Sequence, residues 1–140
     1  MAIGIEVVQT GELFERPKKI TDQVFARFIQ RLVELGEQRL DETLRPRPNG
    51  VYLSTAEAQK GRASTGNYRR NVHSVIKGLN AKITDGGVIY GPWLEGTGSR
   101  NETTQFKGYA SFRKTEVWLN EQAKTEAQKF TNEYVKRLNA

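Results

Sequence analysis

The alternation of apolar and polar residues at the start of the chain predicts a short β-strand. Ile3, Ile5 and Val7 alternate with small or polar residues, which is the period-two pattern of a strand with one buried face. Pro17 then interrupts the chain before the next patterned segment.

That next segment predicts a long helix, because its apolar residues recur every three or four positions. They are Val24, Phe25, Phe28, Ile29, Leu32, Leu35, Leu40 and Leu44. Thr21 or Asp22 can cap the amino terminus of this helix, and Pro46 and Pro48 cannot continue it. We therefore expect a helix from about residue 22 to residue 44.

A second long helix is expected at the end of the chain, from about residue 110 to residue 138. Its apolar residues fall on one face, and Ala123 and Ala127 among them allow a neighbouring element to approach closely. The face consists of Leu119, Ala123, Ala127, Phe130, Tyr134 and Leu138.

The region between the two helices predicts a long loop followed by strands. Pro, Gly, Ser and Thr interrupt residues 45–66, within which Val51–Leu53 could form a brief strand. Three strands are then expected, joined by turns at Gly78–Asn80 and Asp85–Gly87. They are Asn71–Leu79, Ala81–Thr84 and Val88–Tyr90. Gly91-Pro92 ends the third strand, and a flexible stretch follows over residues 96–101.

These elements predict a single α+β domain over residues 1–140. A small antiparallel β-sheet of three to four strands packs against the two long helices, about 22–44 and 110–138, with a long loop at about 45–66. The first strand or Val51–Leu53 is the candidate for a fourth strand.

The positive charge is concentrated in one part of the chain. The formal net charge is +6, and the segment Arg45–Lys82 holds eight basic residues against the single acid Glu57. Such a stretch favours a polyanion as partner, although a solvated arginine-rich loop explains it as well. The candidate residues for contact with such a partner are Arg45, Arg47, Lys60, Arg62, Arg69 and Arg70.

No set of residues suggests catalysis, a cofactor or a metal. The chain has no cysteine and one histidine, His73, whereas a zinc site needs three or four protein ligands. Neither a nucleophile elbow nor a phosphate-binding loop is present. We expect a protein that is not an enzyme, is not inserted in a membrane and is made in a reducing cytoplasm.

Aromatic residues cluster around the third predicted strand and the start of the last helix. They are Tyr90, Trp93, Phe106, Tyr109, Phe112 and Trp118, and we interpret them as core residues or anchors of a subunit interface. Tyr68 beside Arg69 and Arg70 allows another interpretation, in which aromatic rings stack on nucleic-acid bases.

Two segments between the long helices carry a family resemblance. Thr65–Val72 (TGNYRRNV) is followed by Tyr90–Gly98 (YGPWLEGTG) and a Phe-rich entry to the closing helix. In this order they resemble the small head-tail connector or tail-completion proteins of long-tailed bacteriophages, and the resemblance covers about residues 21–140. The segment Arg62–Ser64 departs from many members, which have a proline and an acid there.

The resemblance implies a structural virion protein of the phage neck. Such proteins form rings, usually six-fold, that complete or terminate the tail and join it to the head, with double-stranded DNA in the lumen. In such a ring, the six basic residues named above are the candidates for contact with DNA in the lumen or for docking on a neighbouring ring. Neighbouring neck proteins (stopper or adaptor) and the tail tube or tail terminator are the implied partners, and the host cytoplasm is the place of assembly. In the family, the segment containing Thr65, Gly66 and Arg69 opens a sheet strand.

A candidate subunit interface follows from the second segment, which in the family lies between the sheet and the last helix. Its residues are Tyr90, Trp93, Glu95 and Thr97. The alternative function is a free-standing, non-specific nucleic-acid-binding protein, favoured by the basic middle of the chain.

Overall fold

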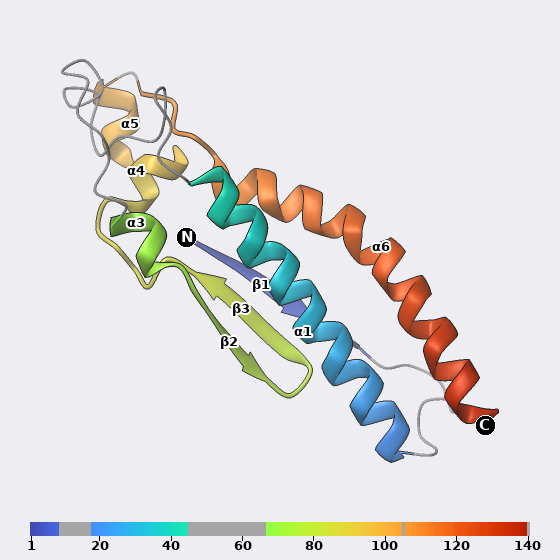
Figure 1. Ribbon diagram of the computed structural model, residues 1–140. Helices are drawn as coiled ribbons and strands as arrows, with labels where there is room; N and C mark the ends of the chain where they lie inside the picture. Colours follow the sequence, from blue (N-terminus) through green and yellow to red (C-terminus); the bar gives the residue numbers. More distant parts are fainter. Residues whose placement is uncertain (9–17, 45–66, 105, 140) are drawn as a thin grey trace.

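A computed structural model describes residues 1–8, 18–44, 67–104 and 106–139, and it has the α+β fold that the sequence predicts (Figure 1). The predicted loop at 45–66, including Val51–Leu53, lies outside the described residues. The strands are β1 (Ala2–Glu6), β2 (His73–Lys77) and β3 (Asn80–Thr84). The helices are α1 (Lys18–Thr43), α3 (Asn67–Asn71), α4 (Gly91–Glu95), α5 (Ser99–Thr104) and α6 (Ser111–Leu138).

The sheet has the order β1-β3-β2, with both pairs antiparallel. The predicted hairpin is confirmed, since β2 and β3 are joined by a turn at Gly78 and Leu79 in which Gly78 has a φ of 57°. A positive φ is cheap for glycine and strained for other residues, so Gly78 suits this tight connection. The first strand of the chain supplies the third member of the sheet.

The prediction of a third consecutive strand at Val88–Tyr90 is wrong. Ile89 is 97% exposed in a turn, and the Gly91 amide donates to the Val88 carbonyl at 2.9 Å. The chain then enters α4, where Pro92 stands in the first turn. Proline fits that position because its fixed φ is helical and the amide it lacks would have no helical partner.

A second correction concerns the residues before β2. Asn71, expected to begin a strand, ends the short helix α3, and Arg69 lies in the same helix. The strand that the resemblance implies around Arg69 is therefore absent there; Thr65 and Gly66 lie outside the described residues.

The helix α1 begins at Lys18, so neither predicted cap is at its amino terminus. Thr21 is buried inside the first turns, where its hydroxyl and that of Tyr134 in α6 form a hydrogen bond at 3.1 Å. The helix ends at Thr43, as the prolines predict, and α6 lies within one residue of its predicted bounds.

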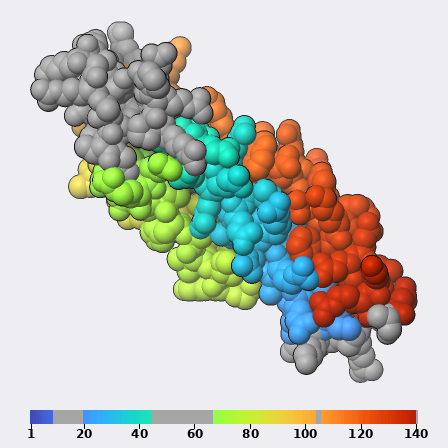
Figure 2. Space-filling view, in the orientation of Figure 1, coloured from blue at the N-terminus to red at the C-terminus, as the bar shows by residue number. Residues whose placement is uncertain are grey.

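Both long helices pack on one face of the sheet. In Figure 1, α1 crosses the sheet and α6 runs beside α1 over most of its length. Gly36 allows the close packing of α1, because a Cβ there would lie 2.5 Å from Ile83 Cδ1 in β3. Figure 2 shows α1 and α6 side by side on the visible surface, with the β2–β3 hairpin along the other flank of α1. The core between these layers contains Ile3, Leu32, Leu40, Ile83, Leu94, Phe112 and Leu119.

Candidate functional surfaces

In the part of the chain that the structure describes, no helix covers the other face of the sheet, and we call it the open sheet face. In each strand the residues that alternate with the buried ones point to it, and all are exposed or half-buried. It consists of Ala2, Gly4, Glu6, His73, Val75, Lys77, Asn80, Lys82 and Thr84. Lys77 and Lys82 outnumber the single acid Glu6, so the face carries net positive charge.

The predicted cationic residues are only partly within the described chain. Arg69 and Arg70 lie in α3, at the end of the sheet where β2 begins. Arg45, Arg47, Lys60 and Arg62 lie outside the described residues.

Arg69 joins α3 to α1. Its Nε donates to Asp41 Oδ1 at 2.5 Å, and this hydrogen bond raises the pKa of Arg69. Because the Asp41 carboxylate offsets the charge of Arg69, this arginine is a weaker phosphate ligand than the sequence suggests.

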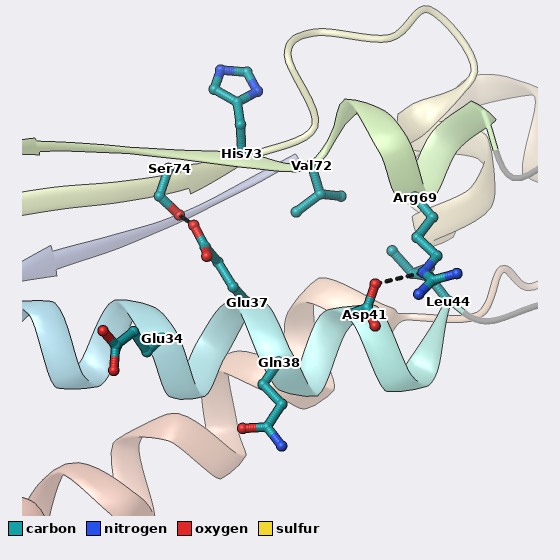
Figure 3. Close-up of a pocket in the computed structure, with 9 residues that line it drawn as sticks. All are labelled: Glu34, Glu37, Gln38, Asp41, Leu44, Arg69, Val72, His73 and Ser74. Carbon is teal, nitrogen blue, oxygen red and sulfur yellow. Dashed lines mark hydrogen bonds and ion pairs between the residues drawn. The ribbon is translucent and has the colours of Figure 1, made fainter.

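Arg69 also borders an acidic groove between α1 and the start of β2. The groove has a volume of about 530 Å³, and Figure 3 shows Glu34, Glu37 and Asp41 along its α1 side. The Ser74 hydroxyl donates to Glu37, which ties β2 to the helix. A groove lined by three carboxylates repels phosphate, so DNA contact is not favoured on this side of α3.

Tyr68 does not support the base-stacking interpretation. Its ring is buried at 5% exposure, and its hydroxyl donates to Asp85 Oδ2 at 3.0 Å. Burial, followed by the Asp85 carboxylate, raises the pKa of Tyr68. Tyr68 is a core residue of this chain.

The four candidate interface residues lie in or next to α4, and two of them are buried within the chain itself. Trp93 is 9% exposed and Glu95 is 2% exposed, whereas Tyr90 is half-buried and Thr97 is exposed. The aromatic cluster packs on the core, with Trp93 and Phe106 rings 4.6 Å apart. This confirms the core interpretation for Trp93.

Glu95 ties α4 to the beginning of α6. Its carboxylate accepts the Phe112 amide at 3.0 Å and the Arg113 amide at 2.8 Å. These amides belong to the first turn of α6, which has no side-chain cap from its own N-cap residue Ala110. A carboxylate there satisfies free donors and complements the helix dipole.

Asp85 performs the same role between β3 and α3. Its carboxylate accepts hydrogen bonds from the Met1 ammonium at 2.8 Å, the Tyr68 hydroxyl at 3.0 Å and the Gly87 amide at 2.9 Å. Burial alone raises the pKa of Asp85, but these hydrogen bonds outweigh it and hold the pKa below its usual range. We call the region around Asp85 and Glu95 the α4 junction.

No metal site or membrane span is found in the part of the chain that the structure describes. No three histidine or carboxylate side chains there gather in a way that could hold a metal ion. No described helix is both long and apolar enough to cross a membrane.

Comparisons of this chain with protein-family models, with curated proteins and with solved structures give no match.

The open sheet face was not predicted from the sequence. Lys77 and Lys82 were recognised only as part of the basic segment, and not as residues that share a sheet face with Glu6. The sequence does contain a sign of this face. In β1 and β3, the residues that alternate with the buried ones include no large apolar residue.

Proposed function

We propose that this chain is a structural protein of the phage neck, forming a ring that completes or terminates the tail and joins it to the head. DNA passes through the lumen of this ring. The observation that carries the proposal is the one-sided sheet, with both long helices on one face and a polar, net positive face left open.

A ring of such subunits has a natural inner side. The helical layer takes up more room than the three-stranded sheet, so it suits the longer outer circumference, and the sheet faces inward. Lys77, Lys82 and the single acid Glu6 are then repeated around the lumen, so each subunit contributes net positive charge there and weak phosphate attraction adds up over the ring. Contact of this kind does not depend on base sequence.

The order of the motifs adds to this support. The segment Tyr90–Gly98 lies between the sheet and α6, and Trp93 and Glu95 within it organise the fold. Neighbouring neck proteins (stopper or adaptor) and the tail tube or terminator are the partners that such a ring requires at its two ends.

The free-standing nucleic-acid-binding protein is the weaker alternative. Its motivating residue Tyr68 is buried, and Arg69 is paired with Asp41. The open sheet face remains the part of the described chain on which a monomer could hold DNA.

The proposal is tested by the assembly state of the purified full chain and by its presence in particles. Light scattering and negative-stain microscopy should show closed rings with an open centre, and antibody labelling should place the protein at the neck of virions. A strictly monomeric protein that is absent from virions would contradict the proposal. If that monomer retards DNA on gels, and the retardation weakens steeply with salt, the alternative function is supported instead.

A further inference from the structure

The two edges of the sheet differ in a way that makes them complementary to each other. We propose that β2 of one copy pairs with β1 of the next copy, so that the sheet continues from subunit to subunit. This inference rests on the proposed ring, and it specifies which surfaces join the subunits.

Both edges offer backbone groups for pairing. In the described chain β1 and β2 are the outer strands, and only β3 has a partner on each side. On β1, the Val7 amide donates to Leu79 and the Met1 carbonyl accepts from Asp85, so the odd-numbered residues face β3. The amides and carbonyls of Ala2, Gly4 and Glu6 therefore point out from the free edge, since direction alternates along a strand. Such an edge is a template for another strand.

The β2 edge carries an apolar side chain without cover. Ile76 pairs with Ala81, so it points to the same side of the sheet as the helices, yet it is 48% exposed. Val75 on the opposite face is 42% exposed. Two adjacent exposed β-branched residues on an edge strand are typical of a surface that is buried in an assembly.

The β1 edge borders a groove on the side of the sheet to which Ile76 points. A groove of about 190 Å³ lies between β1 and α6, on the helical side of the sheet. Its floor is lined by apolar residues, including Ile3, Ile5, Leu119 and Ala123, and polar residues also line it: Glu6, Glu116 and Asn120. A strand added beside β1 would place its helix-side residue over this groove, and Ile76 of a second copy is such a residue.

Charge favours the same arrangement. Within one chain, Glu6 and Lys77 both pair with Asn80, so they stand at the same level of the sheet. If the sheet continues into the next copy with no shift in register, Lys77 of one copy lies beside Glu6 of the next on the open sheet face. Opposite charges on neighbouring strands stabilise pairing, and like charges oppose it.

Strand direction is consistent with a closed ring. Since β1 and β2 are each antiparallel to β3, they run parallel to each other. Joining β2 to the β1 of the next copy in parallel leaves every copy in the same orientation along the strands. A rotation axis along the strands can relate such copies, and a head-to-tail contact of this kind forms a closed ring when the rotation between neighbours divides a full turn evenly.

Cysteine cross-linking tests the contact directly, because the natural chain has no cysteine. The double variant Glu6→Cys/Lys77→Cys should form a ladder of disulfide-linked multimers under mild oxidation. A bond within one chain is out of reach, because β3 separates the two positions by about 9–10 Å. The control pair Glu6→Cys/Lys124→Cys, with Lys124 exposed on α6, should give no ladder.

The assembly state, measured on the same samples without oxidant, separates this inference from the proposed function. Rings that form but give no ladder would overturn the edge pairing and leave the neck proposal intact. Monomers throughout would overturn both. The single variant Lys77→Cys should not cross-link. If it forms disulfide-linked dimers efficiently, β2 pairs with β2 of a second copy about a two-fold axis, and the inference is overturned.

Charge reversal provides an independent measurement. Lys77→Glu should weaken assembly at least several-fold by placing like charges together, and Glu6→Lys should do the same. The double variant should restore assembly if the two residues are neighbours across the contact. No restoration, with both single variants still folded, would contradict the pairing.

Discussion

The α4 junction and the open sheet face differ in the burial of their charged side chains. In the junction, Asp85 and Glu95 are almost fully buried, and their carboxylates accept hydrogen bonds from the chain itself. On the open sheet face, Lys77, Lys82 and Glu6 point outward. The junction therefore holds the subunit together, and the open sheet face is a surface of the described chain that is available to other molecules.

This difference changes the meaning of the second motif. The segment Tyr90–Gly98 supplied the candidate interface, yet Trp93 is packed in the core and Glu95 caps α6. A partner could reach Glu95 only if α6 lost its cap. Of the four candidates, Tyr90 and Thr97 keep accessible surface.

The largest expected effect of a substitution is in the junction. Glu95→Ala should lower the free energy of unfolding by about 3–5 kcal/mol, because it leaves the Phe112 and Arg113 amides without an acceptor, at about 1–3 kcal/mol for each buried donor. Chemical denaturation followed by circular dichroism measures this loss. The control Glu102→Ala removes an exposed carboxylate in α5 and should change stability by less than about 0.5 kcal/mol. Equal effects of the two variants would remove the distinction between junction and surface.

A somewhat smaller effect is expected at Gly96, which ends α4 with a φ of 96°. A Cβ there would lie 2.1 Å from the Lys107 carbonyl oxygen. Gly96→Ala should therefore cost about 2–4 kcal/mol, from the left-handed backbone together with the clash. Gly87→Ala is a matched control, because Gly87 has a φ of 75° but open space around its Cβ position, and it should cost only about 1–2 kcal/mol. Similar melting temperatures for the two variants would show that the junction is less tightly packed than the structure indicates.

The long helices could be predicted from the sequence because each buries one periodic face. The face from Leu119 to Leu138 and the β2–β3 hairpin follow local patterns, and both are confirmed. Local patterns cannot show which strand pairs with β3 on the edge away from β2. That choice is made by contacts distant in sequence, such as Ile3 opposite Ile83.

The errors have the same origin. Val88–Tyr90 has strand-forming residues, but Pro92 and the packing of α4 turn the chain into a helix. Thr21 is a good capping residue that instead bonds to Tyr134, a residue 113 positions away. The buried roles of Asp85 and Glu95 also depend on distant donors, so neither could be read from spacing.

A moderate, pH-dependent effect is expected at Asp85. Asp85→Asn should cost about 1–3 kcal/mol at neutral pH, because an amide cannot replace the carboxylate toward its three donors. The folded pKa of Asp85 lies below its unfolded value of about 3.9. Its contribution is therefore complete above the unfolded pKa and is lost as pH falls through the folded pKa. Urea unfolding at several pH values should show the gap between the natural chain and the variant closing below about pH 4. A gap that stays constant with pH would mean that the charge of Asp85 does not stabilise the fold.

The smallest effect on stability, and the one that defines the open sheet face, is expected at Lys82. This residue lies on the central strand β3, where its side chain is exposed and its removal opens no cavity. Lys82→Gln should change the free energy of unfolding by less than about 0.5 kcal/mol. Assembled rings of the variant should nevertheless hold DNA less well, with a shallower dependence of binding on salt concentration, because each subunit has lost one phosphate-attracting charge. Lys124→Gln on α6 removes the same charge from the helical side and should leave DNA binding unchanged. If both variants bind DNA equally well, the open sheet face does not line the lumen, and the subunits must be turned so that another surface does.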